Sequence, residues 1–178
     1  MRKVTVLGTW RAIPDSELYK QAEMVGSIAA RHGYAVITGA YSGVMEAAAK
    51  GARSSGGYAI GYSWSRLSAQ LAPNPYLNEV VEFESGAMRI AKLIEDADIC
   101  VFFPGRTGTL AELALATELR AKGEKEFPVV LVGDYWRGFY DWLRVSNDQL
   151  PFEIDKQGAA LYVIVTVLDQ IDAIFAKR

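Results

Sequence analysis

Short apolar runs alternate with longer amphipathic segments along most of this sequence. Apolar runs of this kind, bounded by glycine or polar residues, are typical of strands that are buried on both faces of a sheet. The predicted strands are Val4–Gly8, Tyr34–Gly39, Tyr58–Gly61, Ile99–Phe103, Phe127–Gly133 and Leu161–Val165.

The segments between these runs place their apolar residues at helical spacing. Asp15 or Ser16 is a suitable N-cap for the first helix, and Ser42 or Gly43 opens the second. The predicted helices are Glu17–Arg31, Val44–Ala52, Ser85–Glu95, Leu113–Leu119, Tyr135–Val145 and Val167–Ala176.

One region interrupts this alternation. Residues Tyr62–Glu82 lack a regular pattern and contain Pro73 and Pro75, so we predict a loop that lies over the top of the sheet. Elsewhere, continuous apolar strands that alternate with helices indicate a parallel sheet with helices on both faces. We therefore predict an α/β fold, a single Rossmann-like doubly wound domain over residues 1–178, which binds ligands at the C-terminal ends of its strands.

Composition narrows the classes of protein that this chain can represent. It has 178 residues, of which 51% are hydrophobic and 22% charged, and a formal net charge of −2. The acidic balance argues against a nucleic-acid partner, which needs a basic surface. No apolar run approaches the roughly 20 residues of a membrane span, and residues 1–3 lead directly into a strand instead of a signal peptide. We predict a cytoplasmic protein with no membrane partner.

The chain has one cysteine and one histidine, which restricts its chemistry further. Cys100 lies inside an apolar strand and is predicted to be a buried, inert thiol. His32 precedes Gly33, a pattern typical of a helix C-terminus. Nucleophilic triads and Cys/His metal sites therefore lack their residues, and we predict no metal and no cofactor.

The stretch Pro104–Glu112 carries the strongest functional signal. It joins an apolar strand to a helix through a turn rich in glycine and threonine, so free backbone N–H groups and the helix dipole converge on one spot. The predicted phosphate ligands in it are Gly105, Arg106, Thr107, Gly108 and Thr109. Further turns follow other strands at Gly8–Thr9 and Thr38–Gly43, and these can converge on the same crevice.

These elements resemble the LOG family. Its motif PGGxGTxxE stands here as Pro104–Glu112, and its upstream arginine, fifteen residues before the motif proline, matches Arg89. Its GGGxxGLM element resembles Thr38–Met45. Three departures stand out: Arg106 replaces the second motif glycine, Ile90 replaces the lysine after the family arginine, and the triple glycine is reduced to Thr-Gly-Ala. The side chain of Arg106 either obstructs a phosphate sterically or binds it through hydrogen bonds from its guanidinium.

The resemblance implies a homodimer that binds a nucleoside 5′-monophosphate and hydrolyses its N-glycosidic bond to free base and ribose 5-phosphate. Arg89 and Glu112 would be the catalytic residues, since a carboxylate can position a water beside an oxocarbenium-like ribosyl group. Helix-dipole stabilisation is the non-catalytic interpretation of Glu112. The resemblance also implies nucleotide contacts at Gly39, Gly43, Met45 and Met88, and the turn after the first strand adds predicted contacts at Gly8 and Thr9.

An alternative function is a carrier or sensor that binds a nucleotide or cofactor without turnover, because a neighbouring group of similar fold carries molybdenum cofactor. Lysine decarboxylation, a name often attached to the LOG family, is not expected, because no lysine has a suitable setting at a strand end for pyridoxal phosphate. Trp10 and Trp64 lie in predicted strand-end loops and can either stack on a purine or close over the core. The aromatic-rich helix 135–145 is predicted to divide its rings between the core and a dimer interface or the base.

Overall fold

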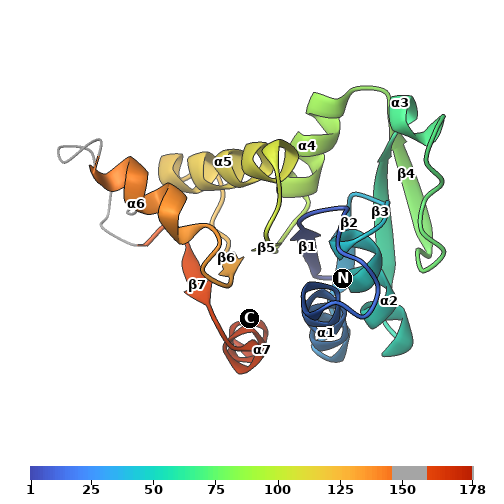
Figure 1. Ribbon diagram of the computed structural model, residues 1–178, viewed down its shortest axis with the longest axis horizontal. Coiled ribbons are helices and arrows are strands. Elements are labelled where there is room, and N and C mark those ends of the chain that lie inside the picture. Colours follow the sequence, from blue (N-terminus) through green and yellow to red (C-terminus); the bar gives the residue numbers. More distant parts are fainter. Residues whose placement is uncertain (146–159, 178) are drawn as a thin grey trace.

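The computed structural model describes residues 1–145 and 160–177, which form a sheet with helices on both sides (Figure 1). The sheet has seven strands in the order β4-β3-β2-β1-β5-β6-β7, and every neighbouring pair is parallel. The strands are β1 (Lys3–Leu7), β2 (Ala35–Thr38), β3 (Ala59–Trp64), β4 (Glu79–Phe83), β5 (Ile99–Phe102), β6 (Val129–Val132) and β7 (Val163–Val165). The predicted α/β, doubly wound, Rossmann-like fold is confirmed.

The helices divide between the two faces of the sheet (Figure 1). Helices α1, α2 and α7 pack on one face, while α4, α5 and α6 cover the other; α3 is a single short turn after β3. Their bounds are α1 (Glu17–Arg31), α2 (Val44–Ser54), α3 (Ser65–Ser68), α4 (Gly86–Glu95), α5 (Thr107–Lys122), α6 (Arg137–Val145) and α7 (Leu168–Ala176). Burial on both faces explains why the central strands are mostly apolar, with Thr5 and Thr38 as fully buried polar residues.

The chain reverses its direction across the sheet between β1 and β5. It builds β1 to β4 outward along one side, then returns through α4 to place β5 against the other edge of β1. Adjacent loops diverge at such a switch point and leave a crevice outside the carboxyl ends of the strands, where doubly wound proteins bind ligands. The loops after β1, β2 and β5 lie at this end.

The prediction of a loop over Tyr62–Glu82 is wrong. β3 continues to Trp64, the chain then forms α3, and residues 79–83 form the edge strand β4, which pairs with β3. The sequence Glu-Val-Val-Glu-Phe lacks the continuous apolar pattern of the inner strands because most of β4 is exposed. Acidic side chains on an edge strand discourage pairing with other chains.

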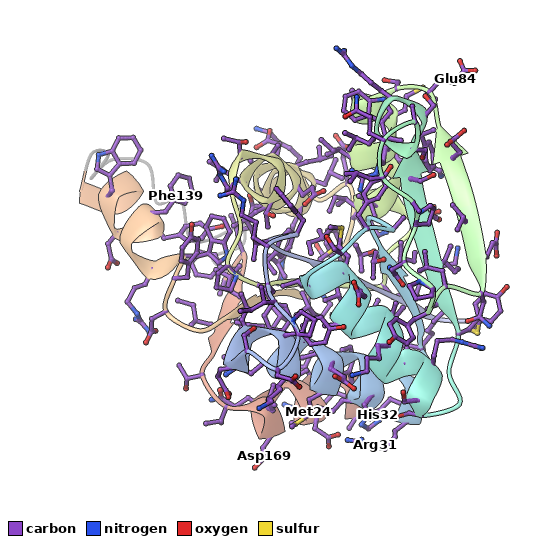
Figure 2. All side chains as sticks on the ribbon, turned by 45° about the vertical axis from the view of Figure 1, so that its right-hand side comes forward. Met24, Arg31, His32, Glu84, Phe139 and Asp169 are labelled. Carbon is purple, nitrogen blue, oxygen red and sulfur yellow. The ribbon has the colours of Figure 1, made fainter. Side chains whose placement is uncertain are left out.

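Other local predictions are confirmed. Ser16 is the N-cap of α1 and its Oγ accepts a hydrogen bond from Tyr19 N. His32 is the C-cap of α1, and Gly33 follows at φ +75°. His32 Nε2 also lies 3.1 Å from Asp172 Oδ1, which ties α1 to α7 where Figure 2 shows His32 beside this helix pair. Cys100 is fully buried, and that burial raises the pKa of its thiol.

No helix within the described residues is long and apolar enough to cross a membrane.

Candidate functional site

Hydrogen bonds join the three strand-end loops into one unit. Thr9 N, after β1, donates to Pro104 O after β5 at 2.9 Å, and Val44 N, after β2, donates to Thr9 O at 3.0 Å. Ser42 Oγ donates to Trp10 O at 3.1 Å. The structure therefore brings together the loops that the sequence predicts to converge.

The motif Pro104–Glu112 forms the open part of this unit. α5 begins at Thr107, and Arg106, Thr107 and Gly108 are exposed. A Cβ placed on Gly108 would meet nothing within 4 Å, so the surface of the first turn of α5 is open at this residue. The first N–H groups of a helix have no intrahelical acceptor and are therefore available to an anion at the helix end.

A close contact between Gly105 and Thr109 determines the shape of the same turn. A Cβ on Gly105 would overlap Thr109 Oγ1 and lie 2.5 Å from Thr109 Cβ, so only glycine fits against this buried threonine. The side chain of Arg106 makes no hydrogen bond or ion pair within the described chain, and it is exposed. Of the two interpretations of Arg106, the geometry favours a guanidinium that is free to reach an anion.

Arg89 lies on α4 and reaches under the loops. Its Nε donates to Tyr62 O at 2.6 Å, and its Nη2 donates to Gly39 O at 2.8 Å, so one side chain bridges β3 and the turn after β2. The guanidinium carbon lies 5.9 Å from the centre of the Tyr41 ring. Burial lowers the pKa of Arg89, although an arginine stays charged in proteins.

Glu112 is the buried acid of the motif. It is only 7% exposed, and no hydrogen bond or ion pair within 4.0 Å to its carboxylate is found among residues 1–145 and 160–177. Burial raises its pKa to about 7, while the positive charge of Arg89 acts in the opposite direction. Arg89 therefore influences Glu112 through space, and the two backbone carbonyls, not Glu112, orient the guanidinium.

The remaining predicted contacts are mostly packed against protein. A Cβ on Gly39 would overlap Arg89 Nη2 and lie 2.7 Å from Met45 Sδ, and one on Gly8 would lie 2.8 Å from Phe103 Cβ. Gly43, at φ +70°, abuts the backbone of Trp10. Met88 is 63% exposed beside Arg89 on α4. Ligand contacts at these residues stay predictions, because the geometry explains the glycines by close packing.

Sequence reasoning missed two residues that shape the site. Tyr135 Oη donates to Gly105 O at 2.8 Å, which fastens the loop after β6 to the motif. Asn74 donates from both N and Nδ2 to Ala40 O, at 2.8 and 3.0 Å, and Ala40 is held at φ +75°. The position of Tyr135 just after a strand next to β5 was an available signal, whereas nothing local to Asn74 indicates its contact with a distant turn.

The rings of the aromatic helix are divided between core and surface, and whether the exposed ones meet a second copy or a base stays a prediction. Trp136 and Tyr140 are buried, and Trp136 Nε1 donates to Phe103 O at 3.3 Å. Trp142, within α6, is 63% exposed, and Tyr135, just before α6, is 57% exposed. Figure 2 shows Phe139 of α6 far from Glu84, which follows β4. The predicted homodimer stays a prediction.

Comparison with known proteins agrees with this architecture. The molybdenum cofactor binding protein from Rippkaea orientalis superposes with a TM-score of 0.73 at 25% identity, over 99% of this chain and 98% of that one. The molybdenum cofactor carrier protein from Chlamydomonas reinhardtii gives 0.73 at 23% identity, over 99% and 96%, which shows the fold alone. An uncharacterised protein from Archaeoglobus fulgidus is 31% identical over 120 residues, 67% of this chain and 78% of that protein.

A family model covers the part of the chain that contains every element of the site. It matches residues 1–136, from β1 through the motif and Tyr135. The chain therefore belongs to the SLOG cluster4 family.

Proposed function

We propose that this protein binds a phosphate-bearing small molecule, a nucleotide or a cofactor, and holds it without turnover. One observation carries the proposal: the N-terminus of α5 is exposed at the switch point of the sheet, and the space in front of Gly108 is open. Helix N-termini in this position bind phosphate because their N–H groups and dipole both favour an anion.

Side chains around the turn add to this binding capacity. Thr107 and Arg106 are exposed at the same helix end, so a hydroxyl and a guanidinium can join the backbone donors. Gly105 is held from both sides, by Thr109 and by the Tyr135 hydroxyl. A turn that is fixed before the ligand arrives loses little entropy on binding.

Molybdenum cofactor is a specific candidate for this ligand. Two of the similar structures are named for binding or carrying it. Its phosphate suits the open turn, where Gly105, Thr107 and Gly108 with Arg106 would hold it. No group of three or more His, Cys, Asp and Glu side chains that could hold a metal ion occurs in the described part of the chain. A carrier requires binding and release, and it requires no reactive side chain.

Hydrolysis of a nucleoside monophosphate is the second candidate, and Glu112 favours it. A buried carboxylate with a pKa of about 7 and no hydrogen-bond partner in the described chain is suited to take a proton from water at neutral pH. Glu112 lies on α5 beyond the residues proposed to hold the phosphate, so in a bound nucleotide it would face the ribose. Carrier and hydrolase thus share the phosphate site and differ in the role of Glu112.

Calorimetry with AMP, combined with chromatography for adenine, separates these functions. We expect AMP to bind to the wild type and to Glu112→Gln with similar affinity, and we expect no adenine after long incubation. Adenine release by the wild type that disappears in Glu112→Gln would replace the carrier with the hydrolase. If neither AMP nor a pterin phosphate binds, the proposed function is wrong.

A further inference from the structure

Trp10 is a large aromatic residue that the fold leaves in solvent beside the motif. Its side chain is 55% exposed, and its neighbour Thr9 donates from N to Pro104 O at 2.9 Å. The other loop tryptophan behaves differently: Trp64 Nε1 donates to Glu84 O at 3.1 Å, and its ring lies 3.3 Å from where a Cβ on Gly86 would be. Trp64 therefore closes against the protein, whereas Trp10 does not.

The exposure of Trp10 does not come from a loose loop. Trp10 O accepts a hydrogen bond from Ser42 Oγ, and Arg11 N donates to Thr9 Oγ1 at 3.1 Å. The backbone of Gly43 packs so closely that a Cβ there would lie 2.5 Å from Trp10 C. Hydrogen bonds and packing on both sides hold the backbone, so the indole is presented outward from a fixed base.

A cation lies against the indole. The guanidinium carbon of Arg11 is 5.1 Å from the centre of the Trp10 ring, within the range of a cation–π contact. Arg11 is exposed and forms no ion pair with any residue of the described chain. The contact places a positive charge beside the indole ring.

We propose that Trp10 is the stacking surface for the flat heterocyclic ring of the ligand, and that Arg11 supports the indole from its other side. This inference rests on the proposed function, because the phosphate must be held at α5 for the ring to reach the indole. It narrows the ligand to ring-bearing phosphates, such as purine or pterin compounds, over sugar phosphates. Stacking tolerates many rings, because each presents a π-face.

The test compares ligands that share a phosphate but differ in the ring. AMP, FMN and ribose 5-phosphate are titrated by calorimetry into the wild type, Trp10→Ala, Trp10→Phe and Trp142→Ala. Trp142 is a matched control, since it is 63% exposed on α6 and takes no part in the loops after β1, β2 and β5. We expect Trp10→Ala to weaken AMP and FMN binding about tenfold and ribose 5-phosphate binding less than twofold.

Recovery of most of the affinity in Trp10→Phe, with no effect of Trp142→Ala, would support stacking. Equal affinity of Trp10→Ala and the wild type for AMP and FMN would overturn the inference and leave the phosphate site intact. A uniform loss for all three ligands would also overturn it, because it would show a disturbed loop. A wild type that binds none of the three contradicts the proposed function itself.

Sedimentation of Trp10→Ala tests a further case, in which the indole lies between two copies of the chain. Dissociation of a dimer into monomers without a change in ligand affinity would overturn the inference.

Discussion

The turns after β2 and after β5 both resemble glycine motifs of one family, yet the surroundings of their glycines differ. In the turn after β2, the space beside Gly39 is filled by Arg89 and Met45, and Gly43 abuts the backbone of Trp10. After β5, Gly105 also packs against Thr109, whereas Gly108, in the first turn of α5, faces open space. The first turn is closed by protein at both glycines, and the second is open at Gly108.

This difference shows that a glycine in a strand-end turn has two separate physical explanations. Removing Cβ allows another part of the protein to approach, or it leaves a surface on which a ligand can lie. The sequence motif does not distinguish these cases, whereas the surroundings of each missing Cβ do. We therefore make predictions for Arg89, for Glu112, and for Gly39 and Gly108.

Arg89→Ala should have the largest effect, because Arg89 closes the turn after β2. The change leaves two backbone carbonyls without their charged donor and removes the positive charge that faces Glu112. We expect a loss of about 4 kcal/mol in the free energy of unfolding at pH 8, measured with urea. Arg66→Ala, an exposed arginine on α3, is the control, with a change below about 0.5 kcal/mol. A loss below about 1 kcal/mol for Arg89→Ala would contradict the closed-turn account.

Glu112→Gln should stabilise the protein at high pH. Burial raises the pKa of Glu112 from 4.5 to about 7, so the folded state disfavours the charged form. Between these two values the folded state holds more protons than the unfolded chain, and stability therefore falls as the pH rises from 4.5 to about 7. At about 1.4 kcal/mol per pH unit, the penalty above pH 7 is about 3 kcal/mol.

Urea denaturation of Glu112→Gln at pH 8 and pH 5 checks this sign. We expect a gain of about 3 kcal/mol over the wild type at pH 8 that mostly disappears at pH 5. Glu118→Gln, at an exposed position of the same helix, should change stability by less than about 0.5 kcal/mol at both pH values. A gain that does not depend on pH would mean that Glu112 is not a buried, titrating acid.

The two glycines should respond to alanine with opposite signs. Gly39→Ala would overlap Arg89 and Met45, and overpacking of this kind costs about 2 kcal/mol. Gly108→Ala meets no atom and replaces a poor helix former in the first turn of α5, so we expect a gain of up to about 1 kcal/mol. Thermal and urea unfolding of the two variants measure both changes. Losses of equal size at both positions would remove the distinction between a closed and an open turn.

The sequence predicted the inner sheet and the motif well because both depend on local pattern. β1, β2, β5 and β6 are short runs of mostly apolar residues, and the strand–turn–helix order around Pro104 indicates where the motif lies. β4 was missed because an exposed edge strand needs no such run. The hydrogen-bond partners of Arg89 could not be predicted either. Gly39 and Tyr62 are distant from Arg89 in the sequence, and only the order of strands in the sheet brings them next to it.

The site shows the same division between local and long-range information. Arg106 is ambiguous as a sequence departure, and only its exposure in the folded chain indicates that it leaves the turn open. Ala40 stands where the resembling family has its third glycine, and it is held at φ +75° by a turn to which Asn74 is bonded. The family glycine is thus explained by backbone conformation, and the strain at Ala40 is offset by contacts from a distant segment.

Phosphate binding at the open end of α5 is tested most directly by Gly108→Asp against Gly108→Asn, with AMP affinity measured by calorimetry. Both side chains enter empty space and have nearly the same shape, and a carboxylate in the first turn of a helix does not destabilise it. Since Asp places a negative charge where the phosphate would lie, we expect Gly108→Asp to fold normally and bind AMP at least 100-fold more weakly than Gly108→Asn, which is on the order of 3 kcal/mol. Equal AMP affinity in the two variants would contradict a phosphate site at this helix end.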